Sequence, residues 1–248
     1  MDGWEGYDHA TYGDRTAAFY DEAHTRADTP VTVERLAELA GDGPVLELGP
    51  GTGRIAIPLA DRGLAVHGID GSPAMVEALR AKPGGARVSV TVGDFGQVDA
   101  PGGPFSLIFV VFSTFFALPG IEAQRDCITR VAERLRPGGR FVMEAFVPDP
   151  SRFELDQRIE VTSVTMDDLR LIASRHDPAE RRVESMMLWF GPWGQRMWPV
   201  RLQYAYPAEL DEMAAAAGLR LEHRWADWDQ PPFVPDDSSK HVSVYVRE

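Results

Sequence analysis

The 248-residue chain lacks several features that would assign it to large classes of protein. With one cysteine, Cys127, it can form no internal disulfide, and it has no Cys/His cluster at metal-ligand spacing. Its 25 basic residues stand against 38 acidic ones, a net charge of −13 that argues against nucleic-acid or anionic-membrane partners. No apolar run approaches the roughly 20 residues that span a bilayer, and the polar N-terminus is unlike a signal peptide. We therefore expect a metal-free cytoplasmic protein with no nucleic-acid or membrane partner.

The segment 45–60, VLELGPGTGRIAIPLA, organises the rest of the chain. Its apolar start predicts a buried parallel strand. Gly49, Gly51 and Gly53 follow on alternate positions, which predicts a tight turn where another group can touch bare backbone. The helix expected next would present free N–H groups and a positive dipole end to that turn. This combination predicts a nucleotide-type crevice at the carboxyl edge of a sheet.

Strands and helices alternate through the first 150 residues. After the first strand, further strands are expected at 64–70, 86–95, 105–116 and 135–146. From 158 to 206 apolar and polar residues alternate instead, which predicts two to four antiparallel strands. A helix over 207–217 and two final strands complete the chain.

We therefore predict an α/β fold, in which a doubly wound, mostly parallel, Rossmann-like seven-stranded sheet carries a small antiparallel sheet inserted after its fifth strand. Residues 1–150 are expected to form the cofactor-binding core with an N-terminal flap. Residues 151–206 would be an antiparallel insertion that covers the substrate, and residues 207–248 the last helix and final two strands of the core sheet.

Four motifs, in order, carry a resemblance to a known family. ELGPGTG ends the first strand, Asp70 closes the second, GDF closes the third, and LRPGG leads into the fifth. Residues 45–146 thereby resemble a class I S-adenosylmethionine-dependent methyltransferase. The resemblance implies S-adenosylmethionine as cofactor and S-adenosylhomocysteine as product. It also implies in-line methyl transfer to a small-molecule acceptor, catalysed mainly by positioning and desolvation.

The resemblance also implies roles for residues at the strand ends. Glu47 would meet the methionyl ammonium, and Asp70 would accept hydrogen bonds from the ribose hydroxyls. Adenine would lie against Met75, with Asp94 accepting from its amine and the Phe95 N–H donating to a ring nitrogen. The full set of expected cofactor-binding residues is Glu47, Gly49, Gly51, Asp70, Gly71, Met75, Asp94, Phe95, Phe112 and Ser113, the last two flanking the methyl donor.

The acceptor side is less determined. Tyr20, His24 and Glu144 are candidate catalytic residues, and the residues expected to contact substrate are Tyr12, Tyr20, Phe116, Trp189 and Trp198. The layout resembles natural-product N-methyltransferases, both deoxyaminosugar enzymes and linaridin-type peptide N-terminal enzymes. The former tend to carry a histidine where this chain has Ala117. An N-acceptor is slightly favoured over an O-acceptor, and monomer and homodimer both stay open.

Two alternatives belong to other classes. Residues 51–56, GTGRIA, satisfy the G-x-G-x-x-A pattern of an NAD(P)-dependent oxidoreductase. That fingerprint normally begins directly at the strand end, where ELGP stands here, and it leaves GDF and LRPGG without a role. The other alternative is a non-catalytic protein with a cofactor fold, which would have a blocked acceptor pocket.

Overall fold

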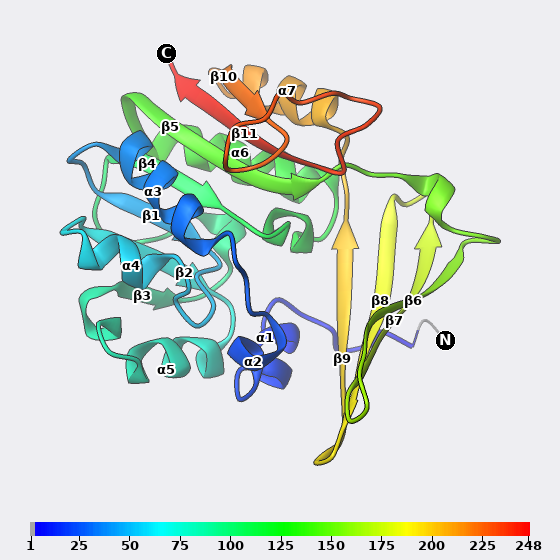
Figure 1. Cartoon of the computed structure of the whole chain (residues 1–248). Helices are drawn as coiled ribbons and strands as arrows, with labels where there is room; N and C mark the ends of the chain where they lie inside the picture. Colours follow the sequence, from blue (N-terminus) through cyan, green and yellow to red (C-terminus); the bar gives the residue numbers. More distant parts are fainter. Residues whose placement is uncertain (1–2) are drawn as a thin grey trace.

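A computed structural model describes residues 3–248 (Figure 1). Its centre is a seven-stranded sheet in the order β10-β11-β5-β4-β1-β2-β3, in which β1 to β5 run parallel and β11 runs antiparallel to both β5 and β10. The predicted seven-stranded, mostly parallel sheet is confirmed. Its strands are β1 (Val45–Leu48), β2 (Val66–Asp70), β3 (Ser89–Val92), β4 (Phe105–Val110), β5 (Leu135–Phe146), β10 (Leu219–Trp225) and β11 (Lys240–Arg247).

Helices cover both faces of this sheet because its central strands are apolar on both sides. One face packs against α3 (Thr29–Ala40), α4 (Ala56–Asp61) and α5 (Pro73–Ala81). The other packs against α6 (Ile121–Arg134) and α7 (Pro207–Ala216). Short 3₁₀ turns lie between these elements: η1 (Gly85–Arg87), η2 (Phe95–Gln97), η3 (Thr114–Ala117) and η4 (Pro150–Arg152).

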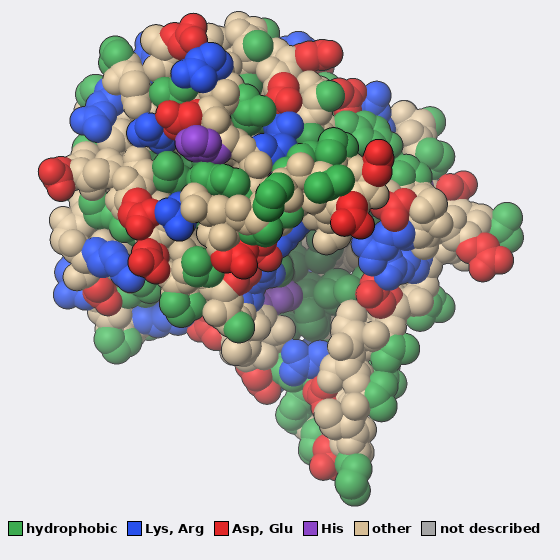
Figure 2. All heavy atoms as spheres, turned by 45° about the horizontal axis from the view of Figure 1, so that its top comes forward, with side chains coloured by type: hydrophobic (Ala, Val, Ile, Leu, Met, Phe, Trp, Pro, Cys, Tyr) green, Lys and Arg blue, Asp and Glu red, His purple; other side chains and the backbone are tan. Residues whose placement is uncertain are grey.

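A second sheet stands beside the core, with strand order β6-β7-β8-β9 and all pairs antiparallel (Figure 1). Its strands are β6 (Gln157–Val164), β7 (Leu169–Asp177), β8 (Arg182–Gly191) and β9 (Gly194–Gln203). The molecule is hollowed between this sheet and the core, and apolar side chains gather in the hollow (Figure 2). The antiparallel insertion predicted from the alternating pattern thus has four strands.

The N-terminal segment forms α1 (Thr11–Thr16) and α2 (Tyr20–Ala23), which lie between α5 and β9 (Figure 1). Polar contacts hold it on both sides. On the core side, Asp14 accepts from the Ser72 hydroxyl at 2.5 Å. On the sheet side, Arg196 pairs with Glu22 at 2.9 Å and Arg170 donates to the Ala23 carbonyl. The segment expected to be a flap therefore bridges the two sheets.

Several element boundaries differ from the expectation: the strand expected over 86–95 is confined to Ser89–Val92, and two other differences lie close to the cavity. The strand expected over 105–116 ends at Val110, because Phe112 and Ser113 both adopt left-handed backbone with φ +59°. The helix expected directly after the glycine turn begins at Ala56, so the turn itself extends through Ile55. Among residues 3–248, no helix is long and apolar enough to cross a membrane.

Candidate functional site

The loop after β1 exposes bare backbone to a cavity of about 350 Å³. Gly49, Gly51 and Gly53 have φ of +75°, +55° and +86°, which other residues adopt only with strain. A Cβ on Gly49 would come within 2.7 Å of the Thr114 side chain, whereas one on Gly51 would meet only open space. The glycines thus allow the turn, and Gly49 and Gly51 line the cavity.

Asp70, at the end of β2, ties this loop to the next turn. Its Oδ2 accepts the Gly51 N–H at 2.8 Å and its Oδ1 accepts the Ser72 N–H at 2.9 Å. Burial raises the pKa of the Asp70 carboxyl, although these two hydrogen bonds oppose the shift. Each carboxylate oxygen keeps a second lone pair, so Asp70 can still accept from a ligand in the cavity that it lines.

Glu47 is buried within β1, behind the glycine loop. Its Oε2 has no hydrogen-bond partner among the described residues. Burial raises the pKa of Glu47 to about 8, against the opposing effect of Arg54 and with a smaller contribution from Asp70 in the same direction. A buried acceptor of this kind is costly unless a ligand satisfies it.

Most of the expected cofactor-binding residues meet at one cavity. Its wall includes Gly49, Gly51, Asp70, Gly71, Met75, Phe95, Phe112 and Ser113. Glu47 and Asp94 lie outside the wall. Asp94 caps η2, where its Oδ1 accepts the Gly96 N–H at 2.8 Å and its Oδ2 accepts from Gln97. The expected adenine contacts of Asp94 stay a prediction.

Five rings enclose the other half of the cavity, and we call them the aromatic box: Tyr12, Tyr20, His24, Phe112 and Trp198. His24 lies at its centre. The Tyr12 hydroxyl is 3.0 Å from His24 Nε2, and the Tyr20 ring centroid is 4.7 Å from that of His24. The rings of Phe112 and Trp198 approach His24 to 5.6 and 6.4 Å.

The aromatic box is uncharged at neutral pH. Burial, together with the positive charges of Arg170, Arg26 and Arg54, lowers the pKa of His24 to about 4. Burial likewise raises the pKa of Tyr20 to about 12 and the pKa of Tyr12 well above its usual value. The box therefore offers a neutral imidazole and two protonated phenols.

Glu144, a candidate catalytic residue, is engaged in holding the backbone of a turn. Its Oε2 accepts the Phe112 N–H at 2.8 Å, while its backbone carbonyl accepts the Ser113 N–H at 3.0 Å. Its Oε1 faces Arg26 and Lys240 at 3.6 and 3.5 Å. Glu144 is buried and does not line the cavity. These contacts support the left-handed turn that carries Phe112 into the aromatic box.

We expect Glu144→Ala to reduce the free energy of unfolding by about 1–3 kcal/mol, because the part-buried Phe112 N–H loses its partner. Glu144→Gln should cost less, since an amide oxygen still accepts that hydrogen bond. Urea denaturation measures both, with Glu122→Ala as control because the Glu122 side chain is 85% exposed. An alanine variant as stable as the wild type would mean that the hydrogen bond does not stabilise the turn.

Two residues expected at the substrate lie elsewhere. Phe116 is fully buried in the core, with its ring against Phe146. Trp189 is buried on β8 beneath Arg170, whose guanidinium lies 4.0 Å from the indole centroid. Neither lines the cavity.

The cavity wall includes residues that the sequence reasoning did not select, namely Tyr7, His9, Thr114, Phe146, Met187 and Arg201. For one of them, Met187, the strand pairing gives a reason to expect it in the wall. Met187 pairs with Trp198 in the β8–β9 ladder and therefore shares its face, which follows once the hairpin register is known.

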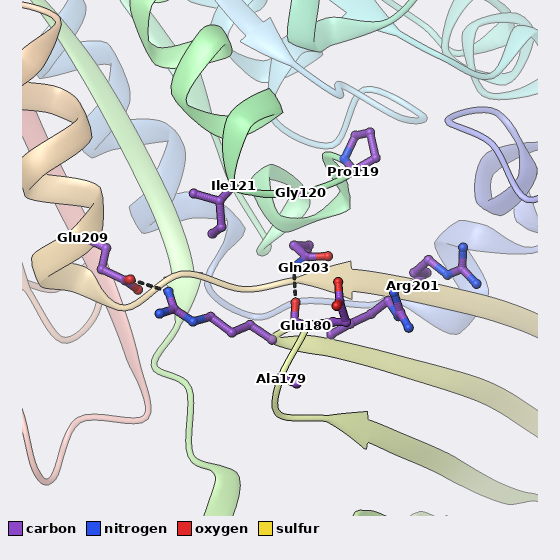
Figure 3. A pocket seen from close by; sticks show the side chains of 10 residues that line it. Pro119, Gly120, Ile121, Ala179, Glu180, Arg201, Gln203 and Glu209 are labelled. Carbon is purple, nitrogen blue, oxygen red and sulfur yellow. Dashed lines mark hydrogen bonds and ion pairs between the residues drawn. The ribbon is translucent and has the colours of Figure 1, made fainter.

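A larger, more open cavity of about 690 Å³ lies at the end of β9 (Figure 3). Its charged side chains satisfy one another: Arg181 pairs with Glu209, and Arg201 pairs with Glu184 at 2.7 Å. The Gln203 side chain donates to the Glu180 carbonyl. The smaller cavity instead brings together the bare backbone of the glycine loop, the acceptor Asp70 and several aromatic rings, so it is the better candidate for a ligand site.

The chain is similar in sequence and in structure to known methyltransferases. Residues 45–139 match a family described as a methyltransferase domain. The chain is similar to the CcbJ methyltransferase from Streptomyces caelestis, with 39% identity, a TM-score of 0.91, and coverage of 98% of this chain and 100% of that one.

Two further relatives cover most of the chain. It is 27% identical over 180 residues to the cypemycin N-terminal methyltransferase of Streptomyces sp, which covers 71% of this chain and 72% of the relative. The SAM-bound CalS10 amino pentose methyltransferase from Micromonospora echinaspora shares the fold, with a TM-score of 0.68 and 23% identity over 94% of this chain and 95% of that one. These relatives give the nicotinamide alternative no support.

Proposed function

The chain belongs to the class I S-adenosylmethionine-dependent methyltransferases, and from that premise we propose that it methylates an amine nitrogen of a small molecule or short peptide. It is an enzyme whose cofactor is S-adenosylmethionine, as the resemblance implied. When bound, the cofactor supplies an electrophilic methyl group on a sulfonium. The chain's own residues must bind, orient and desolvate the acceptor beside it.

The residues that line the smaller cavity, together with Glu47 behind its glycine loop, fit this cofactor. The unpartnered Oε2 of Glu47 suits an ammonium, and the bare backbone at Gly49 and Gly51 leaves room for an amino acid tail. Asp70 retains acceptor capacity for ribose hydroxyls. Met75 and Phe95, both on the cavity wall, would flank an adenine. These assignments follow from chemical complementarity.

The uncharged aromatic box is the observation that favours nitrogen as the acceptor atom. An aliphatic hydroxyl needs a base to become a competent nucleophile, whereas an unprotonated amine attacks directly. His24, with a pKa of about 4, is a weak base, and Tyr12 and Tyr20 remain phenols. A hydroxyl acceptor would therefore find no adequate base in the box.

The residues around the box also favour the neutral form of an amine. Arg26, Arg54 and Arg170 place positive charge near the box and contribute to the lowered pKa of His24. A positive potential lowers the pKa of an entering ammonium, so that it loses its proton before transfer. His24 Nε2 and the Tyr12 hydroxyl can then orient the amine by hydrogen bonding, and Phe112 and Trp198 exclude water.

One of the relatives described above is consistent with this proposal. The cypemycin N-terminal methyltransferase acts on the N-terminus of a peptide, which is an amine.

The test is a panel of matched amines and alcohols, incubated with the purified enzyme and S-adenosylmethionine and read by mass spectrometry. We expect methylated amines and unmodified alcohols. Methylation of alcohols alone would overturn the proposal. Calorimetric titration with S-adenosylhomocysteine verifies beforehand that the protein binds cofactor, so that inactivity toward the panel reflects the choice of acceptor.

We expect kcat/KM for an aliphatic amine to rise about tenfold per pH unit between pH 6 and 8, because the unprotonated fraction of the acceptor rises by that factor. His24 is already neutral throughout this range, since its pKa is about 4. A pH–rate profile of wild type and His24→Phe measures this. The logarithm of kcat/KM should rise with the same slope against pH in both proteins, although their absolute rates differ. An inflection near pH 6.5 that disappears in the variant would show instead that His24 titrates as a base.

A further inference from the structure

The smaller cavity has too little room for the cofactor and a whole acceptor together. Its volume of about 350 Å³ lies near the lower end of the roughly 300–1,000 Å³ that a site for one drug-sized ligand occupies. S-adenosylmethionine, with an adenine, a ribose and an amino acid tail, is itself a ligand of that size. Once it is bound, the aromatic box holds little more than the amine end of an acceptor.

The larger cavity adjoins the smaller one at β9, which is an edge strand of the antiparallel sheet (Figure 3). Arg201 lines both cavities. On β9, Leu202 lies in the wall of the smaller cavity and Gln203 in the wall of the larger one. The turn η3 packs against this strand, and there Ala117 lines the smaller cavity while Pro119 lines the larger one. An acceptor held in the aromatic box therefore reaches the larger cavity by passing between this turn and the edge of β9.

The wall of the larger cavity carries charged side chains that are paired with other side chains of the protein. Arg181 pairs with Glu209. Arg182 lies between Asp177 and Glu184, at 3.3 and 3.5 Å. A charged substituent on the acceptor would have to compete with these pairs. A neutral polar substituent would not, because a guanidinium and a carboxylate each offer more hydrogen-bonding positions than one ion pair uses.

We propose that the larger cavity is the outer subsite for the acceptor, and that it takes a neutral body bearing several groups that both donate and accept hydrogen bonds. This inference rests on the proposed function, which places the amine in the aromatic box. Hydroxyl and amide groups have this double capacity, so a sugar or a short peptide supplies it. Pro119 and Ile121 offer an apolar surface for the carbon skeleton of either.

Ala179 allows a direct test because it is an exposed residue between β7 and β8 that lines the larger cavity and not the smaller one. Ala179→Trp fills the proposed subsite with a bulky side chain. For an acceptor that reaches the subsite we expect kcat/KM to fall about tenfold, the effect of losing about one to three hydrogen bonds. A short aliphatic amine, which ends within the aromatic box, should be methylated equally by wild type and variant.

Two extended amines, an aminoalkyl glycoside and a tripeptide amide, are assayed beside the short amine by mass spectrometry. Each amine is compared with itself in wild type and Ala179→Trp, so that differences in the pKa of the amines cancel. The extended amine whose kcat/KM falls identifies the neutral body as a sugar or a peptide. Ala81→Trp, a matched change at an exposed alanine of α5 that lines neither cavity, should leave all three rates unchanged.

Titration calorimetry with S-adenosylhomocysteine should give the same affinity for wild type and both variants, which verifies that the cofactor site is folded. Equal methylation of the extended amines by wild type and Ala179→Trp would overturn the subsite and leave the proposed function standing. Methylation of the short amine alone would do the same. If the enzyme methylates only alcohols, the proposed function fails, and the same comparison with a short alcohol and a hydroxyalkyl glycoside decides the subsite separately.

Discussion

Replacing Asp70 with alanine should weaken binding of S-adenosylhomocysteine about 5- to 150-fold, equivalent to about 1–3 kcal/mol. The carboxylate accepts the N–H groups of Gly51 and Ser72 in the structure. Under the proposed function it has a second task, because its remaining lone pairs would accept from the ribose hydroxyls. Alanine leaves both backbone donors and both ribose hydroxyls without this acceptor. Isothermal titration calorimetry measures the loss.

A control is needed because the same change loosens the glycine loop. Asp61→Ala removes a half-exposed aspartate paired with Arg87 away from the cavity, and it should leave affinity unchanged. Thermal unfolding of unliganded Asp70→Ala separates the two tasks of Asp70. A variant that unfolds near the wild-type temperature yet binds weakly has lost the ribose contact. Wild-type affinity in Asp70→Ala would refute the ribose assignment.

The core fold was predictable from the sequence because its signals are local. The glycine turn, the acids at strand ends and the switch from helical to alternating periodicity each occupy fewer than about 15 residues. One strand boundary was predicted wrongly because it depends on a contact between residues far apart in the sequence. The strand expected through Phe116 stops at Val110, since two ordinary residues, Phe112 and Ser113, take left-handed backbone. Nothing in FSTFF indicates such a turn, which depends on Glu144, 32 residues further along the chain.

The acceptor side was the least predictable part of the site because distant segments build it. Tyr12 and His24 meet Trp198 only when the N-terminal segment packs between α5 and β9. Composition indicated that aromatic residues gather in the second half, but it gave no means of choosing among the tryptophans. Trp198 and Trp189 are both buried, yet only Trp198 lines the cavity. The register of the β8–β9 hairpin and its placement against the core decide between them.

Affinity for S-adenosylhomocysteine should rise about tenfold per pH unit between pH 6 and 8, until the amino group of the ligand itself loses its proton. Glu47, with a pKa of about 8, is mostly protonated in the unliganded protein over this range. It must ionise to pair with the ligand ammonium, and each pH unit below its pKa costs about 1.4 kcal/mol. The charged or titratable groups that act on Glu47 are Arg54, Asp70 and Tyr20.

Because Glu47 is protonated in the unliganded protein, we expect the stability of that protein to fall as pH rises, whereas its affinity for S-adenosylhomocysteine rises. The folded pKa of Glu47 lies above the unfolded value, so its stabilising contribution is complete below about pH 4.5 and is lost as pH rises to about 8.

Calorimetry in buffers of different ionisation enthalpy should detect release of nearly one proton when S-adenosylhomocysteine binds at pH 7. The Gln side chain of Glu47→Gln does not ionise, so the affinity of this variant for S-adenosylhomocysteine should not change with pH. Equal proton release by wild type and Glu47→Gln would place the titrating group elsewhere and remove Glu47 from the ammonium site.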